Sequence, residues 1–331
     1  MRVRIYGAQA DEKPFYESVQ DAYGFSFTFA PEILTEQTAG ETRGFDAVLI
    51  LTSCKITRAV AGLLHENGVR FIAARSAGFD HIDLDACRDY GLRAANVPFY
   101  APEAIAEHSI LLALTLLRKL PKTLHKVSHG DYTMTGLKGR QLGSLTAGVL
   151  GTGRIGRTTI GLLHGFGCKV LAYDLYPNEA LSDVCTYVSQ EEVLRQADIL
   201  FLHCPLTAEN THLISTQTLA LMKPGAYLIN AARGGLVDAA AVLDALEQGQ
   251  LAGFGFDVYE NERDFVRKNL GHAPADPVFQ ALYAREDVCF TPHVAFYTDR
   301  AVENMIRVSL DNLQEFAQTG ACKNEVTTHE S

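Results

Sequence analysis

Short apolar runs alternate with amphipathic segments over the first hundred residues of the chain. The runs have the length of buried strands, and they are residues 3–6, 47–51, 71–74 and 92–96. The segments between them place apolar residues at helical spacing, and they are residues 13–23, 57–67 and 84–90. Gly68 and Gly91 follow two of these predicted helices, where glycine commonly ends a helix. The alternation predicts a small α/β domain with a mostly parallel sheet.

A long apolar segment follows this first region. Residues 101–120 are apolar on most faces, which predicts a buried helix, and residues 122–130 are expected to continue as helix. Residues 131–145 are polar and contain glycine, as expected of an arm or loop.

The α/β pattern then resumes from residue 146. Strands are expected at residues 147–150, 169–173, 199–203, 226–230, 251–258 and 288–290. Helices are expected after the first of these strands and at residues 238–248, and the amphipathic helix at 299–319 is expected to return to the first domain. The predicted fold class is α/β, with two Rossmann-like domains that have parallel sheets, one inserted in the other.

A glycine-rich turn gives the first indication of chemistry. The run Gly151-Thr152-Gly153-Arg154-Ile155-Gly156 directly follows a predicted strand and opens a predicted helix, and Asp174 ends the next strand. In a dinucleotide-binding turn the first glycine permits the tight bend, the second admits the pyrophosphate, and the third allows helix and strand to pack closely. Asp174 is expected to bind the adenine ribose and repel a 2′-phosphate, so NAD is expected rather than NADP. A simple glycine-rich turn is the alternative.

Composition narrows the function classes. The chain has 331 residues, a formal net charge of −10 and no basic tract, which argues against nucleic-acid and anionic-membrane partners. The longest apolar run is too short to cross a membrane, and the N-terminus lacks the apolar core of a signal peptide. Seven cysteines without a CxxC pair indicate free thiols and a cytoplasmic location, and no metal site is expected.

Five motifs resemble the D-isomer-specific 2-hydroxyacid dehydrogenases. They are residues 75–83 (RSAGFDHID), 96–102 (NVPFYAP), 230–235 (NAARGG), 257–262 (DVYENE) and 291–298 (TPHVAFYT). The likeness extends over residues 45–325 and is strongest to the branch of D-lactate and D-hydroxyisocaproate dehydrogenases. It implies an NAD-binding Rossmann domain at residues 100–299 and a discontinuous substrate (catalytic) domain at residues 1–99 plus 300–331.

The resemblance implies three catalytic residues. Arg233 also stands at the end of a predicted Rossmann strand, where its planar fork can hold a carboxylate, although a buried structural ion pair is the alternative. His293 is expected to donate the proton, because imidazole changes charge near neutral pH. Glu262 is expected to be the acid that stabilises its charged form. Glu260 competes for that role, and we interpret it as a solvated surface acid.

The resemblance also implies the remaining contacts. The expected cofactor-binding residues are Gly151, Gly153, Arg154, Ile155, Gly156, Asp174, Cys204, Pro205, Asn210, Ala231, Ala232, Arg233 and Asp257. The expected substrate-binding residues are Ser76, Ala77, Gly78, Tyr100, Arg233, Phe296 and Tyr297. For the aromatic residues in this second set, core packing is the alternative role.

The predicted function is therefore NAD-dependent reduction of a 2-keto acid, with pyruvate and D-lactate as the expected pair. One alternative is a larger substrate, 2-ketoisocaproate or phenylpyruvate. Another is an NAD-sensing protein like the transcriptional corepressors that share this fold. The family expectation is a homodimer joined through the helix at residues 101–120 and the arm that follows it.

Overall fold

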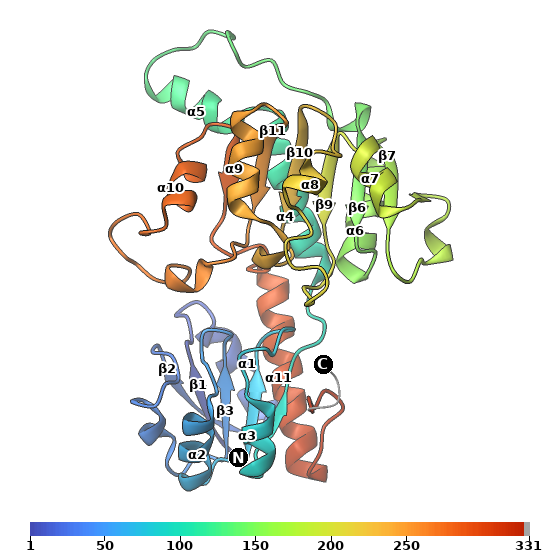
Figure 1. Ribbon diagram of the computed structural model, residues 1–331. Helices are drawn as coiled ribbons and strands as arrows, with labels where there is room; N and C mark the ends of the chain where they lie inside the picture. The colour runs from blue at the N-terminus through green and yellow to red at the C-terminus, as the bar shows by residue number, and fades with distance from the viewer. Residues whose placement is uncertain (328–331) are drawn as a thin grey trace. The chain divides into compact units, whose positions relative to one another are not determined.

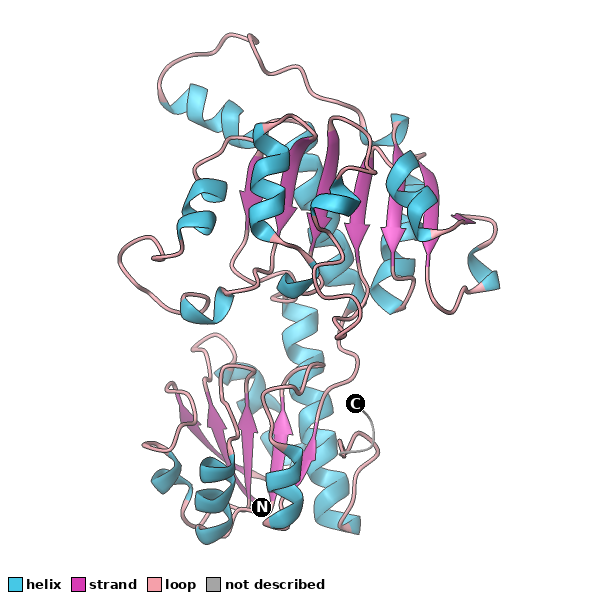
Figure 2. Cartoon of the chain, viewed as in Figure 1, coloured by secondary structure: helices cyan, strands magenta, loops and turns pink. Residues whose placement is uncertain are grey.

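The computed structural model describes residues 1–327, except the side chain of Arg263, and the chain divides into two compact units. Unit 1 contains Met1–Ala101 and the C-terminal segment from Thr298, and unit 2 is Pro102–Tyr297. Each unit has a parallel β-sheet covered by helices (Figures 1 and 2). The predicted α/β fold class, with one unit inserted in the other, is confirmed.

Unit 1 has a five-stranded sheet in the order β2-β1-β3-β4-β5. Its strands are β1 (Arg2–Tyr6), β2 (Ser26–Ala30), β3 (Ala47–Ile50), β4 (Phe71–Ala74) and β5 (Arg93–Ala95). Its helices are α1 (Lys13–Tyr23), the short η1 (Ala39–Thr42), α2 (Arg58–Glu66), α3 (Leu84–Asp89) and α11 (Asp299–Thr319). Edge strand β2 is absent from the sequence-based prediction, although Phe27 and Phe29 alternate with polar residues as in a half-buried strand.

Alternate side chains of each unit 1 strand enter different cores, as the two-residue period of a strand requires. Val48 and Ile50 pack with α2 and α3, whereas Ala47 and Leu49 pack with α1 and α11. The C-terminal helix α11 therefore completes the sheet face of unit 1, where Phe316 stacks on Phe71 at 4.3 Å between ring centroids.

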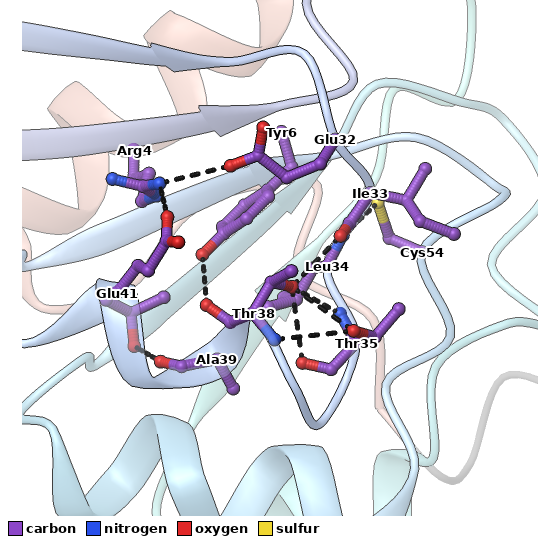
Figure 3. A network of polar contacts seen from close by, with 11 residues as sticks. Arg4, Tyr6, Glu32, Ile33, Leu34, Thr35, Thr38, Ala39, Glu41 and Cys54 are labelled. Carbon is purple, nitrogen blue, oxygen red and sulfur yellow. Dashed lines mark hydrogen bonds and ion pairs between the residues drawn. The ribbon is translucent and has the colours of Figure 1, made fainter.

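A polar network fastens the segment around η1 to the unit 1 sheet (Figure 3). Arg4 on β1 pairs with Glu32 and Glu41, and the Tyr6 hydroxyl donates to the Thr38 carbonyl. The Leu34 amide donates to the Cys54 Sγ at 3.3 Å. Side chains thus hold in place a segment that has little regular backbone pairing of its own.

Unit 2 has a seven-stranded sheet in the order β12-β11-β10-β9-β6-β7-β8. Its strands are β6 (Thr146–Leu150), β7 (Lys169–Tyr173), β8 (Thr186–Tyr187), β9 (Ile199–Leu202), β10 (Ala226–Asn230), β11 (Leu251–Phe256) and β12 (Val288–Phe290). Its α-helices are α4 (Pro102–Leu117), α5 (Leu120–Ser128), α6 (Arg154–Gly165), α7 (Gln190–Gln196), α8 (Thr216–Leu219), α9 (Ala239–Glu247) and α10 (Pro277–Tyr283). Its short 3₁₀ turns are η2 (Leu142–Ser144), η3 (Glu179–Leu181), η4 (Gly234–Leu236) and η5 (Glu262–Asp264).

The order in which strands are added to the unit 2 sheet reverses at β6. The chain adds β7 and β8 on one side of β6 and then places β9 on its other side. In open α/β sheets, ligands bind beyond the carboxyl ends of the strands at such a switch point. The glycine-rich turn lies there, between β6 and α6.

The long apolar segment after residue 101 is two helices and not one continuous run. Helix α4 ends at Leu117, and Lys119 has φ +52°, which breaks the helical path before α5. Pro121 explains the break, because it has no N–H to donate to the carbonyl of Leu117, so the hydrogen-bond pattern of α4 cannot continue through it. None of the helices among residues 1–327 combines the length and apolarity needed to span a bilayer.

Candidate functional site

The glycine-rich turn has the geometry that its sequence predicts. Gly151 has φ +93°, and a Cβ there would lie 2.5 Å from the Cys204 amide nitrogen. A Cβ on Gly156 would lie 1.9 Å from the Gly151 carbonyl oxygen, whereas a Cβ on Gly153 would meet no atom within 4 Å. Two glycines are therefore required by close packing, and the third faces open space at the start of α6, beside Arg154 and Ile155. A dinucleotide pyrophosphate fits this space and the open helix N-terminus.

Asp174 is held in one orientation at the end of β7. Its Oδ2 accepts from the Thr152 amide at 2.5 Å and from the Thr152 hydroxyl at 3.1 Å, and its Oδ1 accepts from the Tyr176 amide. The Tyr187 hydroxyl donates to Thr152 Oγ1 at 2.8 Å. A carboxylate has about four acceptor positions, so one remains on Oδ1 for a ligand hydroxyl. The fixing role of Thr152 was missed in the sequence, although its place between two motif glycines is a usable signal.

Asn210 stabilises the loop after β9 through its side-chain hydrogen bonds. Asn210 Oδ1 accepts from the Thr207 amide, and its Nδ2 donates to the Pro205 carbonyl. Cys204 packs against the Gly151 backbone, and burial raises the pKa of its thiol to about 11. Cys204, Pro205 and Asn210, which are expected to contact the cofactor, therefore shape the loop after β9. The Cys204 thiol is protonated at neutral pH.

Arg233 extends from the turn that follows β10. Its side chain is exposed, its Nη1 donates to the Ala232 carbonyl, and it forms no ion pair among the described residues. Asn230 is fully buried and closes this turn, because its amide donates to the Arg233 carbonyl and accepts from the Ala232 amide. The buried structural ion pair considered as an alternative for Arg233 is absent. Asn230 was missed as a positioning residue.

His293 and Glu262 lie in direct contact. The Nδ1 of His293 is 2.6 Å from Oε1 of Glu262, while Glu262 Oε2 accepts from the Tyr259 amide. Both side chains are partly exposed, at 32% for His293 and 20% for Glu262. His293 has φ +56°, an uncommon backbone conformation for a residue other than glycine.

Glu260 points to a different partner. Its Oε2 is 3.0 Å from Nε2 of His212, and its Oε1 accepts weakly from the Ala239 amide. Glu260 is exposed, as expected of a surface acid, yet it also joins the loop of His212 to the start of α9.

Asp257 is 1% exposed and acts as a clamp on the segment that carries His293. Its Oδ1 accepts from Thr291 Oγ1 at 2.6 Å and from the Val294 amide, and its Oδ2 accepts from the Ala295 amide. Its backbone carbonyl accepts from the His293 amide at 2.8 Å. A cofactor contact is the role expected of Asp257 from the sequence, and no local pattern there indicates this clamp.

The sheet order brings three candidate catalytic residues to one edge. Arg233 follows β10, Glu262 follows β11 after a short turn, and His293 follows β12, and these strands are parallel neighbours. Phe296 lies edge-on to the His293 ring at 6.4 Å between centroids, and Tyr297 is next to it. Ala231 and Ala232 complete the β10 turn. All these residues lie in unit 2.

The other expected substrate-binding residues lie in unit 1. The Ser76 carbonyl accepts from the Val97 amide, the Ala77 carbonyl from Asn96, and the Gly78 carbonyl from the Ser76 hydroxyl. A ligand of this loop would therefore meet its N–H groups. The Tyr100 carbonyl accepts from Asn304 on α11.

Comparison with known proteins shows the family to which the chain belongs. Residues 110–295 match the family described as "D-isomer specific 2-hydroxyacid dehydrogenase, NAD binding domain". The chain belongs to the D-isomer-specific 2-hydroxyacid dehydrogenases. Like other members of this family, it is an NAD-dependent oxidoreductase.

Relatives within this dehydrogenase family cover almost the full chain. An aromatic 2-oxoacid reductase from Clostridium sporogenes is 38% identical over 327 residues, which are 98% of this chain and 99% of the relative. D-lactate dehydrogenase from Escherichia coli is 37% identical over 98% of this chain and 100% of its own length. The solved structure of a D-2-hydroxyisocaproate dehydrogenase has a TM-score of 0.91 and 39% identity, covering 99% of this chain and 100% of that one. The corepressor alternative finds no support among these relatives.

Proposed function

We propose that the protein reduces pyruvate to D-lactate with NADH and catalyses the reverse oxidation. The observation that carries this proposal is the His293–Glu262 contact at the sheet edge from which Arg233 also extends. The similarity to D-lactate dehydrogenase of E. coli supports the choice of pyruvate.

Each of the three residues has one task in this proposal. The Arg233 guanidinium holds the carboxylate or keto oxygen of the substrate through two parallel hydrogen bonds. Glu262 accepts from Nδ1–H of His293, so the proton given to the developing alkoxide leaves from Nε2. The Nδ1 proton stays on the ring, which is neutral after the transfer. In the oxidation direction Nε2 takes the proton back.

The residues at the cofactor site have the space and the hydrogen-bonding groups to hold NAD. The open position at Gly153 and the start of α6 suit the pyrophosphate, and the free acceptor position on Asp174 suits a ribose hydroxyl. Bound NADH supplies the hydride. We place Cys204, Pro205 and Asn210 at the adenine side, and Ala231, Ala232 and Asp257 at the nicotinamide side.

A larger keto acid is the second candidate substrate. Its support is the comparable identity to an aromatic 2-oxoacid reductase and to a D-2-hydroxyisocaproate dehydrogenase. Phe296 and Tyr297 in unit 2, and Ser76, Ala77, Gly78 and Tyr100 in unit 1, are the proposed substrate contacts. Their contribution is tested with substrates of different side-chain size.

The deciding experiment measures kcat/KM for pyruvate, 2-ketoisocaproate and phenylpyruvate with NADH, and the chirality of each product. Pyruvate is expected to give the highest value and a D-hydroxy acid. A higher value for either larger acid would replace pyruvate as the substrate. Formation of the L-isomer, or no turnover with any of the three, would contradict the proposed activity.

We further propose a cytoplasmic homodimer formed through α4, α5 and the arm of residues 131–141. Leu111, Leu124, Val127 and Met134 in this region are exposed, which is costly for a monomer in water. Among residues 1–327 the seven cysteines form no disulfide, which is consistent with a reducing compartment. Sedimentation should give twice the chain mass, and Leu124→Glu should reduce it; a monomeric wild type would exclude the dimer.

A further inference from the structure

A histidine outside the proposed catalytic set lies against the clamp of Asp257. His108 lies on α4, and its Nε2 is 2.8 Å from Thr291 Oγ1 and 3.6 Å from Asp257 Oδ1. Its side chain is 14% exposed, and Thr291 in turn contacts Asp257 Oδ1 at 2.6 Å. One side chain from α4 and the side chains that directly follow β11 and β12 thus form a hydrogen-bonded chain within unit 2.

The chemistry of the three groups determines which of them donates each hydrogen bond and which accepts it. The Asp257 carboxylate accepts from backbone amides and has no proton to give, so the single hydroxyl hydrogen of Thr291 points at Asp257. Thr291 Oγ1 then serves as the acceptor for His108, whose Nε2 is the donor. Burial lowers the pKa of His108, partly opposed by Asp257, so the ring is neutral near pH 7. Its single N–H is therefore on Nε2.

The backbone beyond Thr291 needs such support. His293 has φ +56°, a left-handed conformation that strains the backbone of residues other than glycine. Four hydrogen bonds from residues 291–295 end on Asp257, three on its carboxylate and one on its carbonyl. The orientation of Asp257 therefore sets the position of His293.

We infer that His108 is a positioning residue, which through Thr291 and Asp257 holds the proton-donating His293 in place. This inference rests on the proposed function for its kinetic consequence, but the direction of the hydrogen bonds can be tested without turnover. The sequence offered no hint of it, because His108 and Thr291 are 183 residues apart.

The kinetic test uses pairs of variants that differ in the hydrogen-bonding group. His108→Leu and Thr291→Val remove a group while keeping similar volume, and each is expected to lower kcat about tenfold. KM for the keto acid should change by less than about threefold, because the proton is transferred only in the transition state. His108→Gln and Thr291→Ser keep a donor and a hydroxyl and should retain most of kcat. His164→Leu, an exposed histidine on α6, is the control for the substitution itself.

A double variant tests whether His108 and Thr291 act through the same chain of hydrogen bonds. The double variant His108→Leu/Thr291→Val should be no slower than the slower single variant. Multiplied losses would mean independent effects and would overturn the inference. So would wild-type kcat in His108→Leu, or equal losses in His108→Gln and His108→Leu, which would indicate packing alone.

A spectroscopic measurement separates this inference from the proposed function. In protein labelled with ¹⁵N-histidine, the resonances lost in His108→Gln identify His108, and their shifts report which nitrogen carries the proton. The Nε2–H form is expected at pH 7, and the Nδ1–H form would overturn the inference even in an active enzyme. If the wild type reduced no keto acid, the proposed function would fail while this measurement still decided the hydrogen-bond direction.

Discussion

The first β-α turn of unit 1 and the glycine-rich turn of unit 2 have the same place in similar sheets but are closed in different ways. In unit 1, Glu12 precedes α1 and its buried carboxylate pairs with Arg75 at 2.7 Å. A Cβ on Gly7 would lie 2.8 Å from the Leu51 side chain. In unit 2, α6 begins directly after Gly153, whose Cβ position is open, and no acidic residue occupies its first turn.

The difference lies in what satisfies each turn. In unit 1 the protein supplies both the anion and its counter-charge, so that turn is complete without a ligand. In unit 2 the open helix N-terminus and amides are available for the phosphates of NAD. The shared architecture therefore does not assign the function, and a few side chains at the turn do.

Replacement of Gly156 should have the largest effect on this comparison. Gly156→Ala would force a methyl group to within 1.9 Å of the Gly151 carbonyl, so the turn must open. We expect NADH affinity to fall more than about a hundredfold, or about 3 kcal/mol. NADH fluorescence titration measures it. Gly161→Ala on the same helix has no atom within 4 Å and is the control; a normal affinity in Gly156→Ala would show that the contact is not needed.

Replacement of Arg233, which follows β10, should reduce activity, whereas replacement of Arg75, which follows β4, should reduce stability. Arg233→Lys should lower kcat/KM for the keto acid by about a hundredfold with an unchanged melting temperature, because a point charge cannot replace the exposed fork. Arg75→Lys should instead destabilise the protein by about 2 kcal/mol, because a single nitrogen cannot occupy both the Nη1 position that bonds Glu12 and the Nη2 position that bonds the Tyr6 carbonyl. Chemical denaturation and steady-state kinetics of both variants check this. Loss of stability in Arg233→Lys would indicate a structural role.

Acid should weaken unit 2 through a histidine beneath its glycine turn. Burial lowers the pKa of His203 from 6.5 to about 4, with its Nε2 in contact with Thr159 Oγ1. The unfolded chain therefore binds the proton first, so this stabilisation is complete above pH 6.5 and is lost as pH falls toward 4. At pH 5 the loss is about 2 kcal/mol. His203→Gln should show a shallower decline in unfolding free energy between pH 6.5 and 4; an equal slope would exclude His203 as the cause.

Cofactor choice should depend on the single acid of the unit 2 turn. We expect kcat/KM with NADH to exceed that with NADPH by at least about tenfold, or 1.4 kcal/mol, because Asp174 repels a 2′-phosphate. Asp174→Ala should narrow the ratio, and Asp183→Ala, an exposed acid nearby in sequence, should leave it unchanged. Equal use of both cofactors by the wild type would contradict this role.

The smallest expected effect separates the two neighbouring glutamates. Glu262 accepts from His293 Nδ1 and orients its ring, so Glu262→Gln should lower kcat/KM for keto-acid reduction about fivefold. Glu260→Gln should leave this value unchanged, because Glu260 contacts His212. Steady-state kinetics of both variants provide the test. A loss in Glu260→Gln with none in Glu262→Gln would reverse the assignment.

Local pattern was enough for much of the fold. The predicted strand at residues 71–74 and the helices at 13–23 and 299–319 have the bounds observed, because apolar periodicity and end signals are local properties. The close packing at Gly151 and Gly156 also followed from spacing, since a tight bend and a close helix contact act within a few residues. The break at Lys119 was missed despite Pro121, because apolar residues continue on both sides.

Local sequence patterns were sufficient to predict two parallel sheets, the glycine turn followed by Asp174, and the residue types able to move a proton or hold a carboxylate. Which of these residues meet depends on the packing of the whole chain. The order β12-β11-β10-β9 places Glu262 on His293 and Glu260 on His212, and the packing of α4 brings His108 to Thr291. Such contacts depend on strand order and helix placement, which arise from burial over the whole chain and leave no local period to read.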